Sequence, residues 1–507
     1  MEKSKKLILG ISTSYIHSIL NIGVNLALVP IILSSIGKLE YGIWITILSI
    51  VGYMGLLDFG VATATSKFLS ENNTPNLPEA KKIISNSFTV YSIIASIVVV
   101  ITVFLSFFLM RFFDIREDLL SISSIVFLLA GLNMALSFPS NVFGSVLFGF
   151  KDFFSFNIIN ILGVIVNAIL TIVLLKMGFG IMSLAVVLLL TTFFVLFLRV
   201  VYLKKTMPDL FSNLWGFDRT IFFKILSFSG FMLVLSLGGQ IVFNTDSIII
   251  AKFLGISSVA TYAIAFRMTQ ATTTFTYKIS DAFFPFFSEF HSSKNKDKFV
   301  LFLFESTKFS IGLATILFLI LIFLGKDIIG LWVGSQNFVG NLIFYFMALV
   351  ALMGSIIRPG VMALKGMGKL KKIVLFNILE AFLNLFFSIF LVLKFGLFGV
   401  ILGTFLAMFV TSFWLVPFTV CREGQISFKK YFFETIFMPI LLGVCLMLPF
   451  LFFNFGMINN NWLIIIIKAM LLSIIYLFLF VFLCINKERR LFYMEKLRCF
   501  LLKKAIF

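Results

Sequence analysis

The chain has 507 residues, of which 60% are apolar and only 12% are charged, and its formal net charge is +19. Soluble domains carry roughly 25% charged residues, so no soluble fold of this length could bury all the apolar side chains. The mean hydropathy of +1.11 therefore predicts a protein of the lipid bilayer. Soluble enzymes are excluded, and a nucleic-acid-binding domain is not expected because the basic residues are scattered between apolar runs.

Fourteen apolar runs follow one another along the chain, each close to the roughly 20 residues that a membrane helix needs. A barrel strand needs only ~10 residues, so these runs predict an all-α integral membrane protein with fourteen transmembrane helices. The first run, residues 7–33, is too long for a signal-peptide core and is expected to remain as a span. The runs are centred near residues 21, 55, 96, 134, 164, 190, 236, 274, 312, 351, 386, 408, 443 and 476.

Lysine and arginine residues between the runs indicate the orientation of the chain. With both termini inside, the inner segments hold 27 basic residues and the outer loops hold seven, while a further seven lie within the runs. By the positive-inside rule, this predicts a multi-pass membrane protein with both termini in the cytoplasm. No loop is long enough to form a domain, and no metal-ligand spacing is present, so neither a metal nor a cofactor is expected.

An internal repeat runs through the first twelve spans. Pro139 and Pro359 lie 220 residues apart, as do Asn157 and Asn377. Because six spans separate the copies, both copies have the same orientation, as in transporters whose halves rock around a central site. The predicted parts are a six-helix lobe over residues 1–215, a second over 216–425, and two appended spans with a basic tail over 426–507.

Short motifs in the two copies resemble a known family. Residues 28–37 read LVPIILSSIG, 41–44 read YGIW and 55–60 read GLLDFG, while 244–247 in the second copy read NTDS. With the fourteen spans and the parallel repeat, these motifs make the chain similar to polysaccharide repeat-unit flippases, which export O-antigen or capsule units. Those flippases belong to the multidrug/oligosaccharidyl-lipid/polysaccharide exporter superfamily, and the resemblance extends from the N-terminus to about Val420.

The resemblance implies a V-shaped, MATE-like pair of six-helix lobes around a cationic cavity that opens to each side in turn. It implies a transporter and not an enzyme. The implied cargo is an undecaprenyl-pyrophosphate-linked oligosaccharide, moved from the cytoplasmic to the outer leaflet of a bacterial cytoplasmic (inner) membrane. The implied partners are membrane lipid, this lipid-linked glycan, an H⁺ or Na⁺ gradient and a polysaccharide polymerase.

Three other functions stay open at this point. A multidrug exporter of the same superfamily would need an acid-rich cavity for cationic drugs, whereas the eighth span carries Arg and Lys. An exporter of a cell-wall lipid precursor is harder to exclude. A membrane polymerase or glycosyltransferase would need a sizeable outer loop or an acidic catalytic site, and the most charged outer loop, residues 111–118, is short.

The eighth span carries the clearest candidate binding face. A charge at the centre of a membrane costs at least ~2.5 kcal/mol, so it is expected beside water or a partner. At 100° per residue, five polar side chains fall within about 60° of one line along this helix. They are Arg267, Gln270, Thr274, Lys278 and Asp281. Arg267 and Lys278 would attract the pyrophosphate and sugar of the implied cargo; in the alternative, Lys278 and Asp281 only neutralise each other.

Other polar residues within the spans are candidates for binding or coupling. Asn21 and Asn25 in the first span could bind sugar hydroxyls, or equally could hold neighbouring helices together by hydrogen bonds. Asp58 is the only acid deep in the first lobe. It is a candidate for carrying a coupling ion, although it could equally tie down a neighbouring helix end. Glu380, one turn into the eleventh span, is a second ion-coupling candidate.

Two prolines are candidate hinges. Proline removes a backbone donor and commonly kinks a helix, so Pro139 and Pro359 are expected to bend the fourth and tenth spans. Arg358 immediately precedes the second proline. It is expected to attract an anion or to pair with an acid, for which Glu380 is the candidate.

Overall fold

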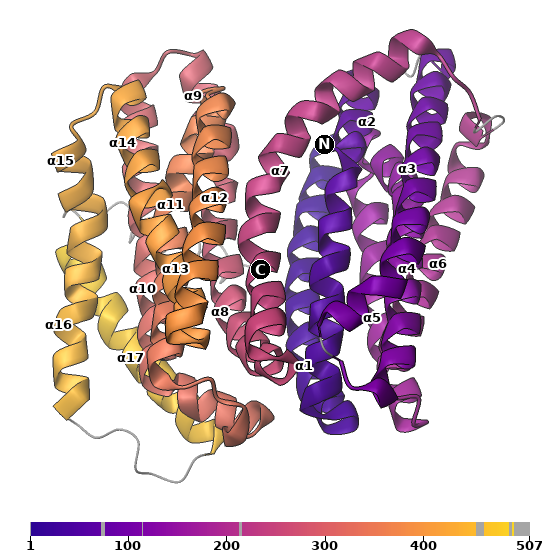
Figure 1. The fold of residues 1–507 in the computed structure, drawn as a ribbon. Helices are drawn as coiled ribbons and strands as arrows, with labels where there is room; N and C mark the ends of the chain where they lie inside the picture. The colour runs from indigo at the N-terminus through magenta and orange to yellow at the C-terminus, as the bar shows by residue number, and fades with distance from the viewer. Residues whose placement is uncertain are drawn as a thin grey trace, which may run out of the picture. The chain divides into compact units, whose positions relative to one another are not determined.

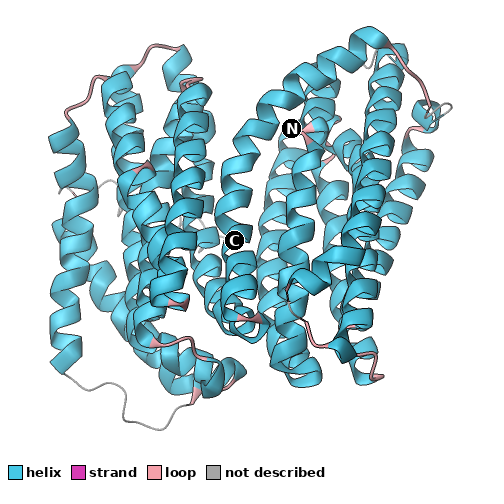
Figure 2. Cartoon of the chain, viewed as in Figure 1, coloured by secondary structure: helices cyan, strands magenta, loops and turns pink. Residues whose placement is uncertain are grey.

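The computed structural model describes residues 2–71, 77–113, 115–211, 215–452, 461–485 and 489–490. Within these residues all regular elements are helices (Figures 1 and 2), and eleven helical segments are long and apolar enough to cross a membrane. The predicted all-α, multi-pass membrane fold is therefore confirmed. The count of fourteen crossings stays a prediction, and most of the predicted basic tail lies outside the described residues.

The helices form two compact units. Unit 1 comprises Met1–Ala263 and Ser388–Val400, and unit 2 comprises Ile264–Phe387 and Ile401–Phe507. One border between them falls within α8 (Ile256–Ala282), so the polar face predicted on this helix belongs to unit 2. The stretch Ser388–Val400 returns to unit 1. The division of the chain at residues 215 and 425 stays a prediction.

Unit 1 is built from long helices that pack side by side. In chain order its elements before α8 are α1 (Glu2–Met54), η1 (Gly55–Asp58), α2 (Val61–Glu71), α3 (Leu77–Phe112), α4 (Glu117–Gly149), α5 (Phe153–Lys176), α6 (Met182–Thr206), η2 (Pro208–Phe211) and α7 (Arg219–Leu254). α4 packs along α3 and α6, while α1 packs along α5 and α7. Each long helix of this unit therefore has a face buried against at least one neighbour.

α1 is too long for a single crossing. Its 53 residues would extend ~80 Å at 1.5 Å per residue, against a hydrocarbon core of ~30 Å. Gly37 interrupts it with a φ of 77° and a ψ of 175°, a backbone conformation that a residue without a Cβ adopts readily. The predicted first span therefore lies in the arm of α1 before this glycine. The predicted second span begins in the arm after it and continues through η1 into α2.

Gly42, just after this joint, allows α1 to approach the start of α8 closely. A Cβ atom on Gly42 would lie 2.2 Å from the carbonyl oxygen of Ile256, so the backbone would have to move. We expect Gly42→Ala to cost about 1–3 kcal/mol of stability, seen as a lower melting temperature of the purified protein. Gly23→Ala on the same helix is the control, because nothing lies within 4 Å of its Cβ position. Equal melting temperatures of the two variants would contradict the close contact.

The segment between α6 and α7 joins the two sequence copies. Asp218 caps α7, because its carboxylate accepts hydrogen bonds from the backbone N–H groups of Thr220 and Ile221. The same carboxylate lies 3.1 Å from Lys82 Nζ on α3. The hydrogen bond from Lys82 lowers the pKa of the Asp218 carboxyl, so the cap is charged at neutral pH. The start of α7 is thereby attached to α3.

Unit 2 packs around α10 and α11. From α8 onward the elements are α9 (Phe284–Ser292), α10 (Lys296–Val333), η3 (Ser335–Asn337), α11 (Asn341–Gly366), α12 (Leu370–Phe395), α13 (Leu397–Val410), α14 (Ser412–Gly424), α15 (Phe428–Tyr431), the π-helical turn η4 (Phe432–Phe437), α16 (Met438–Phe452) and α17 (Trp462–Leu483). α13 and α14 form the predicted twelfth span, which is broken at Thr411 by non-helical backbone angles. The appended helices α16 and α17 pack on α10.

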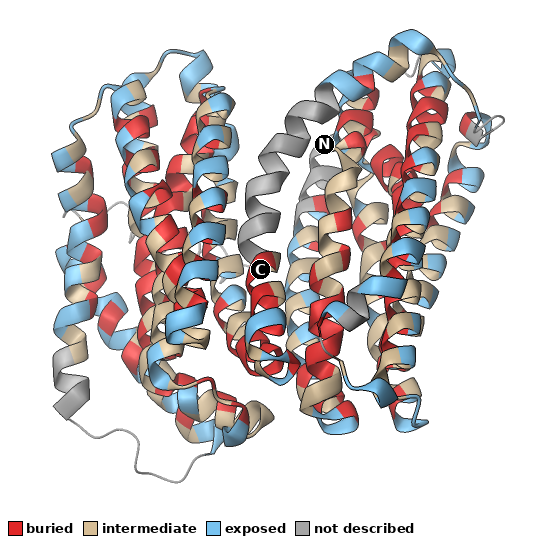
Figure 3. Cartoon of the chain, viewed as in Figure 1, coloured by how far each residue is buried: buried red, intermediate tan, exposed pale blue. Residues whose placement is uncertain are grey.

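Exposed residues occur along the helices of each unit (Figure 3), and many of them are large and apolar. Phe104 is 63% exposed and Phe107 67% exposed in unit 1, and Ile474 is 67% exposed in unit 2. Soluble monomers rarely show such extended apolar surfaces. The outward apolar faces therefore fit a surrounding of lipid tails, which assigns the multi-pass chain to a membrane.

Candidate functional site

A contact between two charged side chains inside the spans of unit 2 joins α8 to α11. Arg358 Nε on α11 donates a hydrogen bond to Asp281 Oδ1 on α8 at 2.7 Å. The guanidinium carbon lies 4.9 Å from the centre of the Tyr277 ring, one helical turn before Asp281. The side chains of Arg358 and Asp281 remain 27% and 39% exposed. The pair is therefore accessible to water or to a ligand, and its arginine is held in place by both a carboxylate and an aromatic face.

This arrangement differs from both pairings that the sequence left open. Asp281 pairs with Arg358 and not with Lys278, and Arg358 pairs with Asp281 and not with Glu380. Lys278 and Asp281 are three residues apart on one helix, a spacing that permits a contact. Arg358 reaches Asp281 from another helix, and the spacing along one helix does not indicate such a contact. Arg358 directly precedes Pro359, and this proline is buried within α11.

Two residues that the sequence did not single out complete the cluster. Lys365, two turns beyond Arg358 on α11, interacts electrostatically with both Arg358 and Asp281. Gly354 lies beside Tyr277: a Cβ at that glycine would come within 2.5 Å of the tyrosine hydroxyl oxygen. Two cations, Arg358 and Lys365, lie near Asp281, and Glu380 also interacts electrostatically with Tyr277. Cations outnumber acids when Arg267 and Lys278 on the same face of α8 are included. The sequence already places Tyr277 one helical turn before Asp281 on the same helix. The contact of Gly354 with Tyr277 joins two helices and therefore depends on tertiary packing.

The rest of the predicted face of α8 is also accessible. Arg267, Thr274 and Lys278 are half-buried and Gln270 is exposed. The Thr274 hydroxyl donates to the carbonyl oxygen of Gln270 at 2.9 Å, a local contact within the helix. The side chains that the helical periodicity placed on one line are therefore all at least partly accessible in unit 2. Their role in binding stays a prediction.

Asp58 lies in a break between two helices of unit 1. It ends η1, and the next residues, Phe59 and Gly60, have φ values of 49° and 75°. The Tyr91 hydroxyl on α3 donates a hydrogen bond to Asp58 Oδ1. The Tyr91 ring stacks on Phe138, with ring centres 5.7 Å apart, and Phe138 immediately precedes Pro139. A chain of contacts thus links the candidate coupling acid to the candidate hinge.

Glu380 occupies a buried position at the break between α13 and α14. Its carboxylate accepts hydrogen bonds from the hydroxyls of Ser412 and Thr411, the latter at 3.4 Å. One turn further along α12, Asn384 Nδ2 donates to Thr404 Oγ1 at 2.9 Å. Glu380 is therefore satisfied by hydroxyl groups of the following helices, which explains why Arg358 takes another partner.

Among the residues that the structure describes, no group of three or more metal-ligating side chains occurs.

Asn21 and Asn25 lie on the first arm of α1 and are both exposed. Asn25 Nδ2 donates to Asn21 Oδ1 at 2.9 Å and to the Asn21 carbonyl oxygen at 2.8 Å. These bonds stay within one helix, so they hold no neighbouring helix in place. The amides remain on a surface that can offer hydrogen bonds to hydroxyl groups.

Arg199 is a further buried charge in unit 1 that the sequence did not mark as a site. Its Nη1 donates to the carbonyl oxygen of Ser140 at 3.0 Å, and its Nη2 donates to Asn160 Oδ1 at 3.0 Å. The residue on α6 thereby binds α4 directly after Pro139 and also binds α5. It holds together the three helices around the candidate hinge.

Two protein-family models match the chain. The family of polysaccharide biosynthesis proteins matches residues 9–291, more than half of the chain. The chain belongs to the polysaccharide biosynthesis protein family. The MatE family matches residues 231–390, in the second half. Membership confirms the resemblance drawn from the sequence motifs and assigns the chain to the multidrug/oligosaccharidyl-lipid/polysaccharide superfamily of flippases and transporters.

Solved structures share the fold of this polysaccharide biosynthesis protein. The lipid II flippase MurJ in an inward closed conformation matches with a TM-score of 0.69 over 92% of this chain and 98% of its own, at 16% identity. An inward-facing multidrug transporter of the MATE family matches with a TM-score of 0.62 over 77% of this chain and 95% of its own, at 17% identity. These likenesses confirm the predicted MATE-like fold.

A curated relative also aligns with part of the chain. The probable low-salt glycan biosynthesis flippase Agl15 of Haloferax volcanii is 25% identical over 191 residues. The alignment covers 37% of this chain and 40% of that protein. The chain thus spans less than half the length of the curated relative that it matches.

Proposed function

We propose that the protein flips an undecaprenyl-pyrophosphate-linked oligosaccharide from the cytoplasmic to the outer leaflet of a bacterial cytoplasmic membrane. The two sequence copies, residues 1–215 and 216–425, would rock against each other so that the site opens to each side in turn. Both termini would lie in the cytoplasm. The observation that carries the proposal is the accessible, positively charged polar face of α8 and α11 in a chain of the polysaccharide biosynthesis family.

The chemistry of the cargo fits that face. A pyrophosphate presents several anionic oxygens, which Arg and Lys bind by charge-assisted hydrogen bonds. Arg358 is held by Asp281 and Tyr277, so little side-chain freedom is lost when it binds an anion. Arg267 and Lys278 lie along the same helix face as Asp281. Neutral hydrogen-bonding groups then suit the sugar hydroxyls, and the candidates are Gln270, Thr274, Asn21 and Asn25.

An ion gradient would supply the energy through Asp58 and Glu380. Binding of H⁺ or Na⁺ to Asp58 would change the hydrogen bond from Tyr91. Because Tyr91 stacks on Phe138, the change would reach Pro139 and shift the packing of α4. Glu380 holds the break between α13 and α14, where a change of charge would alter the contacts of Ser412 and Thr411.

The function can be tested with purified protein in liposomes that contain a synthetic undecaprenyl-pyrophosphate oligosaccharide. Flipping makes the glycan accessible to an added glycosidase that cannot cross the bilayer. We expect Arg267→Ala to reduce the rate at least about tenfold, because one charged hydrogen bond to the pyrophosphate is lost. Arg422→Ala is the control, since this exposed arginine lies in the last turn of α14. No protein-dependent glycan exposure would reject flipping, and equal rates in the two variants would remove Arg267 from the site.

A further inference from the structure

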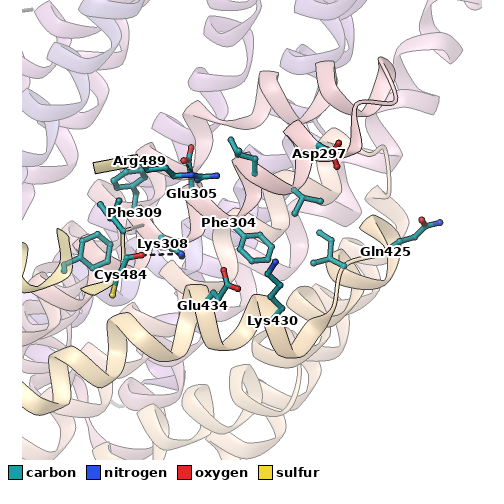
Figure 4. A pocket seen from close by; sticks show the side chains of 15 residues that line it. Asp297, Phe304, Glu305, Lys308, Phe309, Gln425, Lys430, Glu434, Cys484 and Arg489 are labelled. Atoms are coloured by element: carbon teal, nitrogen blue, oxygen red, sulfur yellow. Dashed lines mark hydrogen bonds and ion pairs between the residues drawn. The ribbon is translucent and has the colours of Figure 1, made fainter. Parts of the chain in front are cut away.

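A separate cavity lies in unit 2 where the appended helices pack on α10 (Figure 4). Its volume is about 450 Å³, within the range of roughly 300–1,000 Å³ that is typical of small-molecule sites. The first half of α10, the turn before α15, the π-helical turn η4 and the end of α17 form its walls. None of the residues assigned to the proposed cargo site lines this cavity.

Some of the charged side chains that line this cavity form an ion pair, and others do not. Arg489 donates to Glu305 across one wall, and Lys308 Nζ lies 3.4 Å from the carbonyl oxygen of Cys484. Lys430 and Glu434 lie one turn apart on the opposite wall. Figure 4 shows the Glu434 carboxylate between the amines of Lys308 and Lys430. Within the described part of the chain, Lys308, Lys430 and Glu434 form no ion pair within 4.0 Å. A ligand can therefore contact both the lysine amines and the glutamate carboxylate.

The backbone around Glu434 supports a binding role. Glu434 belongs to the π-helical turn Phe432–Phe437, and single π turns within α-helices occur frequently at functional sites. The wider turn changes the direction of side chains relative to a regular α-helix. Here it lies where Glu434 and Lys430 both line the cavity.

The depth of the cavity points to a lipid. Every wall comes from a chain segment that the distribution of basic residues places at the cytoplasmic side. Lys308 lies twelve residues after the start of α10 at Lys296, or ~18 Å along the helix. The cavity therefore extends from the headgroup layer toward the acyl chains. Apolar side chains complete its lining, among them Phe304, Phe309 and Phe480.

We propose that this cavity binds the headgroup of an aminophospholipid from the inner leaflet. The phosphate would accept a hydrogen bond from Lys430, and the primary ammonium group would donate hydrogen bonds to Glu434, whose carboxylate lies between the amines of Lys430 and Lys308. A purely anionic headgroup would leave Glu434 facing a like charge, and a quaternary ammonium group has no N–H to donate. The ligand would be a structural lipid that holds α15–α17 on α10, and it is distinct from the transported cargo.

The proposal can be tested by native mass spectrometry of the purified full chain, which resolves bound lipids. We expect phosphatidylethanolamine to be retained more strongly than phosphatidylglycerol, and phosphatidylcholine least. Lys430→Gln should weaken retention of phosphatidylethanolamine about tenfold. Glu434→Gln should remove the preference for phosphatidylethanolamine over phosphatidylglycerol. Both side chains are exposed, so these substitutions should leave the fold intact.

Lys429→Gln is the matched control, because this exposed lysine precedes Lys430 but does not line the cavity. Equal retention by the Lys429 and Lys430 variants would overturn the proposal, as would equal retention of the three lipids by the unaltered chain. Displacement of the lipid by inorganic phosphate at millimolar concentration would instead indicate a site for a free anion and would also overturn it. Because flipping is not measured, a failure of the proposed function leaves this test unaffected.

Discussion

Removing either charge of the contact between Arg358 and Asp281 is expected to slow flipping at least about tenfold. Loss of one partner from a buried ion pair costs about 3–5 kcal/mol, because the remaining charge is left alone in a medium of low polarity. Here both side chains are more than a quarter exposed, so water compensates part of that cost. Arg358→Ala and Asp281→Ala can be compared with the unaltered chain in the glycosidase assay. Monodisperse elution of each variant would show that it folds.

The exchanged variant, with Asp281→Arg and Arg358→Asp together, separates two roles of this pair. If the pair only holds α8 and α11 together, the exchange should restore most of the flipping rate. If Arg358 binds the pyrophosphate from its own position beside Tyr277, the exchange should leave the rate as low as in Arg358→Ala. We expect the second result. Full restoration would contradict a direct role of Arg358 in cargo binding.

Asp58→Asn is expected to make flipping independent of an imposed ion gradient and to lower the driven rate about a hundredfold. The amide keeps the size and hydrogen-bonding capacity of the side chain but cannot gain or lose a proton and carries no charge for Na⁺. Tyr91→Phe should give a smaller loss, because the acid remains while its hydrogen bond is removed. Rates should be measured with and without proton and sodium gradients across the liposome membrane.

Asp118→Asn is the control for Asp58→Asn. Asp118 is exposed and pairs with Arg116 two residues earlier. It lies at the start of α4, about 30 Å along the helix from Pro139. A gradient response that is the same in the Asp58 and Asp118 variants would exclude Asp58 as the coupling residue. In that case Glu380 would be the next position to substitute, with Gln as the replacement.

The sequence predicted features that depend on order along one helix. The polar face of α8 follows from the 100° step between residues, and its members are accessible as expected. The joint at Gly37 lies between the first two predicted spans, since one arm of α1 is already long enough for a crossing. Family membership was predicted from motifs such as GLLDFG at residues 55–60, which contain the helix break around Asp58.

Contacts between helices could not be predicted in this way. Arg358 and Asp281 are 77 residues apart, and no periodicity indicates which face of α11 meets which face of α8. Glu380 is a candidate partner of Arg358 in the sequence, whereas in the structure the hydroxyls at the break after α13 donate to its carboxylate. Arg199 was counted only as a basic residue within a span. Its hydrogen bonds to α4 and α5 depend on how the three helices pack, which the order of residues along one helix does not indicate.

The single-residue joint at Gly37 limits how the N-terminal part of this protein can change in length. A flexible loop would absorb an inserted residue, but here both arms of α1 are helical up to the glycine. One extra residue in either arm would rotate everything beyond it by 100° and shift it by 1.5 Å. The contact of Gly42 with Ile256 would then face a different direction. Natural variation in length should therefore be absent at this joint and should occur instead in the connections at the ends of the other spans.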